Sequence, residues 1–134
     1  MTGTIYVENN VGRALHDAIN LFTHNHGWTA VWQHDIHPEM QRSQHGDEWW
    51  IRDIAGRGFA ILTQDRAILD DPYERAVVVE AGASIIAFGD GNMPQWNKLR
   101  CLIVHWAVIE RILAEPGPQA VTIWLTKHKV ERFV

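Results

Sequence analysis

The sequence is poor in cysteine, in long apolar runs and in positive charge, and each shortage excludes a class of protein. Cys101 is the only cysteine, so no disulfide can form within the chain and a reducing cytoplasm is the expected location. The apolar stretches are far shorter than a membrane-spanning helix, and the N-terminus lacks the pattern of a signal peptide. A net charge of −4 argues against broad, non-specific binding of nucleic acid but leaves room for a local basic groove.

The sequence does have enough apolar material for one domain with a real core. Its 134 residues are 46% hydrophobic, which predicts a single domain over residues 1–134. No internal repeat or low-complexity tract divides the chain. Seven tryptophans and eight histidines are many for this length, and exposed tryptophans would indicate a partner surface.

Short apolar runs alternate with segments whose apolar residues recur at helical spacing. The runs predict five strands, at residues 4–7, 28–32, 59–62, 84–88 and 120–125. The helical spacing predicts helices near residues 11–22, 47–56, 72–81 and 94–114, the first of them capped by Asn9 or Asn10. The polar stretch 33–46 is interpreted as a loop with room for a short helical turn. This alternation predicts a three-layer α/β/α fold around a four- or five-stranded parallel sheet.

The long C-terminal helix carries several expectations about burial. It should begin at Pro94 and place Trp96, Ile103 and Trp106 on its inner face, with His105 as a packed core histidine. Trp49 lies one residue off the apolar stripe of its own helix, so its ring is the better candidate for an exposed base-stacking surface. The segment 127–132 is interpreted only as a basic tail.

Acidic residues follow two of the predicted strands and open a helix beside them. Glu8 ends the first strand, Asp65 follows the third with Thr63 just before it, and Asp47 begins the helix that leads into the third strand. Ligands of open α/β sheets collect at the carboxyl ends of the strands. Crowded carboxylates repel unless a cation or a proton relieves them, and oxygen ligands suit Mg²⁺ or Mn²⁺. Such an ion can activate water and stabilise charge on a phosphate, which indicates phosphodiester hydrolysis.

A purely structural interpretation of the same residues stands beside the catalytic one. Aspartate after a strand commonly caps the turn or helix that follows, and Asp65 is placed to do so. Histidines 34, 37 and 45 in the long polar stretch could form a zinc site, but their spacing is loose and no cysteine assists, so solvated loop histidines are favoured.

Three segments together resemble the PIN-domain family, in the small PIN-like branch related to toxins of bacterial toxin–antitoxin pairs. They are Ile5–Asn10, Asp47–Ile51 and Gly58–Arg66, the last of which contains the family's Thr-x-Asp pattern. The resemblance implies a sheet of four or five parallel strands and a ribonuclease that depends on Mg²⁺ or Mn²⁺. It also implies RNA as the substrate, and a cognate antitoxin and a homodimer as partners, while the short apolar stretches predict no membrane association.

The resemblance assigns roles to particular residues. Glu8, Asp47 and Asp65 would hold the metal and serve catalysis, and Thr63 would orient a carboxylate or a water. Asp90, at the end of the fourth strand, is the geometric candidate for a fourth acid, with Glu48 and Asp70 as other positions. Asn10 would accompany Glu8 and contact the substrate. Apart from the resemblance, four basic residues lie near helix starts at this edge and could hold phosphates, although each alone suits an ordinary surface charge: Arg13, Arg66, Lys98 and Arg100. Arg13 and Arg66 are the expected substrate contacts among them.

Two alternatives remain beside the ribonuclease. The family usually has Asp at the first acidic position, and Glu8 is one methylene longer, which favours a catalytically weak or inactive PIN-like module that binds RNA or a protein. A receiver-type signalling domain also gathers acids at strand ends and would use Asp65 as its phosphate acceptor. Asn9 and Asn10 after Glu8 fit that class poorly.

Overall fold

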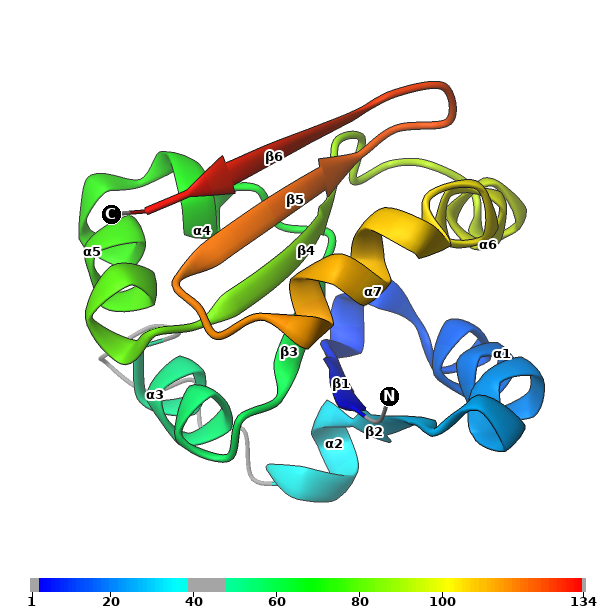
Figure 1. The fold of residues 1–134 in the computed structure, drawn as a ribbon, viewed down its shortest axis with the longest axis horizontal. Helices are drawn as coiled ribbons and strands as arrows, with labels where there is room; N and C mark the ends of the chain where they lie inside the picture. The colour runs from blue at the N-terminus through cyan, green and yellow to red at the C-terminus, as the bar shows by residue number, and fades with distance from the viewer. Residues whose placement is uncertain (1–2, 39–47, 134) are drawn as a thin grey trace.

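The structure, a computed structural model, describes residues 3–38 and 48–133. Within these ranges six strands form one sheet in the order β2-β1-β3-β4-β5-β6 (Figure 1). The strands are β1 (Gly3–Val7), β2 (Trp28–Trp32), β3 (Ala60–Thr63), β4 (Ser84–Phe88), β5 (Gln119–Ile123) and β6 (His128–Arg132). The first five run parallel and β6 pairs antiparallel with β5. The predicted α/β class is confirmed, and β6 adds a strand where the sequence indicated only a basic tail.

Helices cover both faces of the sheet, as the three-layer prediction requires (Figure 1). On one face lie α1 (Arg13–Thr23), α6 (Gln95–Val104) and α7 (Trp106–Ala114). On the other lie α3 (Glu48–Gly56), α4 (Ala67–Asp70) and α5 (Pro72–Ala81). The single turn α2 (Gln33–Ile36) follows β2, and short 3-10 turns, η1 (Asn9–Val11) and η2 (His24–His26), flank α1. In the described ranges no helix combines the length and apolar character needed to cross a membrane.

Residues of each strand alternate between the two apolar layers, because successive side chains of a strand point to opposite faces. Ile5 and Val7 pack in the layer of α1, whereas Tyr6 packs in the layer of α3. Leu62 and Ile61 divide in the same way on β3. Because both faces are covered, these strands read in the sequence as unbroken apolar runs.

Local signals set the helix ends, although one of them was misread. Asp71 caps α5, since its carboxylate accepts the backbone N–H groups of Tyr73 and Glu74 at 2.8 and 3.1 Å. The expected cap of α1 by Asn9 or Asn10 is wrong. Those residues form η1, which is closed by a hydrogen bond from the Val11 N–H to the Glu8 carbonyl at 3.0 Å. Gly12, with a φ of 108°, then begins α1.

The predicted long C-terminal helix is two helices, and some residues expected to be buried are exposed. His105 separates α6 from α7 with a φ of −103° and a ψ of 15°. Its ring is buried, as predicted, and its Nε2 lies 2.7 Å from the Trp124 carbonyl oxygen. The predicted burial of Trp96 and Ile103 is wrong, since they are 67% and 63% exposed. Both side chains lie on α6, whose buried residues are Lys98, Cys101 and Leu102, so the apolar pattern selected the opposite face of this helix.

Candidate functional site

The strand order creates a switch point between β1 and β3. From β1 the chain passes to β2 on one side of it and then returns to β3 on the other side. The connections that leave β1 and β3 therefore diverge, and open α/β sheets bind ligands in the crevice at such a point. Glu8 directly follows β1 and Thr63 ends β3. Two of the sequence-predicted residues thus lie at this edge.

A buried threonine connects the two acidic residues of this edge. Glu8 is only 6% exposed, and its backbone N–H donates to the Leu62 carbonyl at 3.1 Å, which continues the pairing of β1 with β3. The Thr63 hydroxyl donates to Glu8 Oε2 at 3.1 Å. The oxygen of the Thr63 hydroxyl in turn accepts the backbone N–H of Asp65 at 2.9 Å. The structure therefore brings Glu8, Thr63 and Asp65 together.

Asp65 also has the structural use that the sequence indicated as an alternative. Its Oδ1 accepts the backbone N–H of Ala67 at 2.8 Å, which stabilises the turn into α4. The neighbouring Arg66 forms an ion pair with Asp70 at 3.5 Å. The cap fixes the orientation of the Asp65 carboxylate, so capping and a role in the site do not exclude each other.

The other candidate acids lie apart from this trio or outside the described residues. Asp47 is outside them. Asp90 is exposed in the loop after β4, where its Oδ1 accepts the backbone N–H of Asn92 at 2.9 Å. Glu48 begins α3 and pairs with Arg52 at 3.0 Å. Among the residues that the structure describes, no three His, Cys, Asp or Glu side chains are grouped closely enough to hold a metal ion.

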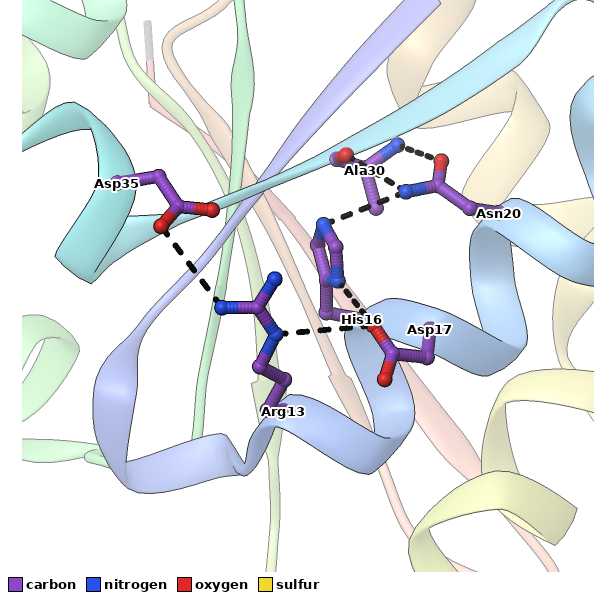
Figure 2. A network of polar contacts seen from close by, with 6 residues as sticks. All are labelled: Arg13, His16, Asp17, Asn20, Ala30 and Asp35. Atoms are coloured by element: carbon purple, nitrogen blue, oxygen red, sulfur yellow. Dashed lines mark hydrogen bonds and ion pairs between the residues drawn. The ribbon is translucent and has the colours of Figure 1, made fainter.

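Arg13, which was expected to contact substrate, is held between two carboxylates (Figure 2). Its guanidinium lies 3.9 Å from Asp17 and 3.7 Å from Asp35. The network continues along α1 through His16 to Asn20, whose side-chain amide binds both backbone groups of Ala30 on β2, at 2.8 and 3.0 Å. A phosphate group would have to compete with two anions for Arg13. The second expected contact residue, Asn10, is exposed on η1.

Lys98, which is interpreted from the sequence as a surface charge, is buried near this edge. Its side chain is buried, with 3% exposed, and its Nζ donates to Gln64 Oε1 at 2.5 Å. Gln64 stands between Thr63 and Asp65 in the sequence, so this hydrogen bond connects α6 to the turn that follows β3. Burial lowers the pKa of Lys98, and the nearby Asp90 carboxylate opposes that shift. Lys98 shares the buried face of α6 with Cys101 and Leu102, but a pattern of apolar residues does not mark a charged side chain as buried.

A second series of hydrogen bonds lies on the α3 side of the sheet and includes His37. The Tyr6 hydroxyl is 2.7 Å from His37 Nδ1, and Asp53 Oδ2 is 2.7 Å from His37 Nε2. Hydrogen bonds from Arg57 and then from His37 hold the pKa of Asp53 below its ordinary value. Burial raises the pKa of Tyr6, so its hydroxyl stays protonated. Both ring nitrogens of His37 are thereby engaged in holding the fold.

The remaining loop and aromatic expectations resolve in the same region. His34 is exposed, which agrees with its interpretation as a solvated histidine and not a zinc ligand. His45 lies outside the described residues. Trp49 is half-buried, with its ring centroid 4.8 Å from that of His37. The expected exposed base-stacking ring at Trp49 is therefore wrong.

Comparison with known proteins identifies one family. A family model described as a PIN like domain matches residues 4–90, which is more than half of the chain. The match includes Glu8, Thr63 and Asp65 and ends at Asp90. It favours the PIN-like interpretation over the receiver-type one. No curated protein and no solved structure matched the chain.

Proposed function

The chain belongs to the PIN-like domain family, and from this premise we propose that it is a divalent-metal-dependent endoribonuclease that acts as the toxin of a toxin–antitoxin pair. The observation that carries the proposal is the joint position of Glu8 and Asp65 at the switch point, coupled through the Thr63 hydroxyl. The family match supports a nuclease-type fold. Cleavage of RNA, the choice of Mg²⁺ or Mn²⁺ and a cytoplasmic location belong to the proposal.

The donor set at this edge suits a hard divalent cation. Glu8 and Asp65 offer carboxylate oxygens and Thr63 offers a hydroxyl, and oxygen is the ligand atom that Mg²⁺ and Mn²⁺ prefer. Asp47 and Asp90 are the proposed further ligands. When bound, such an ion supplies positive charge to the phosphate and increases the acidity of a water. The low exposure of Glu8, 6%, strengthens the attraction between its carboxylate and a cation, because screening by water is reduced.

The chain's own groups would then hold the reacting atoms in place. Thr63 keeps Glu8 Oε2 in one orientation, and the Ala67 N–H does the same for Asp65 Oδ1. A carboxylate fixed in this way can orient the attacking water and accept its proton. Misplacement of such groups by about 1 Å can cost on the order of a hundredfold in rate. The hydrogen bonds around Thr63 are therefore part of the proposed catalytic arrangement.

A second candidate function is a PIN-like module that binds RNA or a protein without cleaving. It is favoured by Glu8, which replaces the shorter acid usual in the family. It is also favoured because, in the described part of the chain, no three acidic or histidine side chains are grouped for a metal. The two candidates differ in whether RNA that is bound is also cut.

The decisive experiment compares wild type with Asp65→Asn. We expect wild type to bind Mn²⁺ or Mg²⁺ in calorimetry and to cleave RNA, and Asp65→Asn to lose both while it keeps its far-ultraviolet circular dichroism spectrum. The amide oxygen can still accept the Ala67 N–H, so the fold should survive. Glu80→Gln, which removes an exposed acid on α5, is the matched control and should keep full activity. Cleavage by a well-folded Asp65→Asn protein would refute the assignment.

Wild type that binds RNA but never cuts it would establish the second candidate. The variant Glu8→Asp is a separate test, of the first acidic position. It should leave cleavage unchanged or raise it, because it restores the usual family residue. A clear loss would show that the longer acid is adapted to this site.

The proposed partners are a second copy of the chain and a cognate antitoxin. A groove of about 560 Å³ between α1 and α6–α7, lined by Phe22, Leu102, Ile103 and Trp106 among others, supports the homodimer. Phe22 and Ile103 are 67% and 63% exposed, and exposed apolar side chains gathered in one groove are typical of a protein–protein interface. Light scattering should find a dimer in wild type and a monomer in Ile103→Glu. The antitoxin is proposed to cover the acidic edge with a basic or aromatic segment.

A further inference from the structure

The C-terminal hairpin, β5–β6, brings an aromatic ring to the carboxyl edge of the sheet. The Trp124 N–H donates to the Lys127 carbonyl at 2.9 Å, which closes the turn between the two strands. The Trp124 ring lies against Gly89, the residue that follows β4, since a Cβ on Gly89 would be 2.1 Å from the ring atoms Cε2 and Nε1. Figure 1 shows this turn beside the loop that leads from β4 to α6.

Two cations gather on this ring. Lys127 Nζ lies 4.8 Å from the centroid of Trp124, and the Arg66 guanidinium carbon lies 5.7 Å from it. Cations at such distances are attracted to the negative face of an aromatic ring. One comes from the hairpin and the other directly follows Asp65. The Trp124 ring therefore holds Lys127, which lies outside the family match over residues 4–90, near the sheet edge that carries Glu8 and Asp65.

Both cations keep capacity to bind an anion. The Arg66 side chain is 29% exposed, and its Nη2 lies 3.5 Å from the exposed Asp70 carboxylate, a surface ion pair that contributes little energy and that a phosphate can replace. Lys127 is exposed at the turn. Lys98, buried beneath the same edge and bonded to Gln64 at 2.5 Å, adds positive potential. In a chain of net charge −4, such a local concentration of cations is what a polyanion needs for binding.

We infer that Arg66 and Lys127, held on the ring of Trp124, form a cation pair that binds the sugar–phosphate backbone of single-stranded RNA and leads it to the acidic edge. The choice of RNA rests on the proposed function. Phosphate contacts fix the register of a nucleic acid on a protein without reading its sequence. The cation pair thus sets where along the strand a phosphodiester meets Glu8 and Asp65.

The test measures binding separately from cleavage. Anisotropy of a fluorescein-labelled single-stranded RNA is followed in EDTA, at about 50 and about 200 mM salt. Lys127→Ala should weaken binding on the order of 3- to 10-fold at the lower salt and reduce the slope of log affinity against log salt by about 0.7. Lys129→Ala is the matched control. It removes the same charge from the same hairpin, but Lys129 is paired with Glu131 at 3.7 Å, and binding should change less than about twofold.

The outcomes distinguish this inference from the proposed function. Equal losses in Lys127→Ala and Lys129→Ala would mean that only net charge matters, which overturns the cation pair. An unchanged salt slope in Lys127→Ala, or no RNA binding by wild type, also overturns it, whatever the cleavage assay gives. The expected loss specific to Lys127→Ala supports the cation pair even if wild type never cleaves RNA, and in that case the failure belongs to the proposed function.

Discussion

Replacement of Thr63 by valine tests the central link of the site. Valine has the shape and β-branching of threonine but no hydroxyl, so it removes the bonds to Glu8 Oε2 and from the Asp65 N–H at 3.1 and 2.9 Å. A hydrogen bond to a charged group contributes about 1.5–3 kcal/mol and one between neutral groups about 1 kcal/mol. The threonine is fully buried, so water cannot replace either bond freely. We expect the free energy of unfolding to fall by about 2–4 kcal/mol.

Urea denaturation followed by circular dichroism measures this change, and Thr122→Val is its control. Thr122 has the same burial on β5, two strands away from β3, and its replacement should change stability by less than about 1 kcal/mol. A stable Thr63→Val protein, with a loss no larger than that of the control, would refute the coupling of the two acids through this hydroxyl. If Glu8 is also catalytic, Thr63→Val should lower the cleavage rate under conditions where it remains folded.

Three further predictions concern charge and close packing. Lys98→Met should raise the free energy of unfolding at neutral pH. Because burial lowers the pKa of Lys98 below its ordinary 10.5, wild-type stability should rise with pH through the interval below 10.5 and the advantage of the variant should shrink there. Asp53→Asn should destabilise the protein at neutral pH, and the difference should vanish as pH falls below 3.8 and through the lowered pKa of Asp53, which urea titrations at several pH values would show. Gly89→Ala should displace the Trp124 ring, since the new Cβ would lie 2.1 Å from it, and a changed near-ultraviolet circular dichroism spectrum would report this.

Much of the fold could be predicted from the sequence, because local or repeating residue patterns determine its strands and helix ends. Strands buried on both faces appear as short apolar runs, and Asp71 before Pro72 marks the start of α5. The Thr-x-Asp pattern located Thr63 and Asp65 at a strand end. Their proximity to Glu8 followed from the rule that the carboxyl ends of parallel strands share one edge.

What the sequence could not supply depends on contacts between distant segments. The break at His105 accompanies a contact with the Trp124 carbonyl at 2.7 Å, nineteen residues away along the chain. The strand β6 has mostly exposed side chains, so it lacks the apolar alternation that marks a strand. The cation pair depends on the turn before β6, which holds Lys127 on the ring of Trp124, the same ring that Arg66 contacts. No local pattern encodes either the break or the pair.

The amide of Asn20 gives the sheet a protected border. Asn20 donates to the Ala30 carbonyl and accepts the Ala30 N–H at the middle of β2, as the backbone of an adjoining strand would. At the opposite border, β6 carries Lys129, Glu131 and Arg132, and charged side chains on an outer strand discourage further pairing. Both borders therefore resist pairing with a strand from another molecule. Oligomers of this protein should accordingly form through helical surfaces, and Asn20→Ala should create a variant prone to aggregation by strand addition.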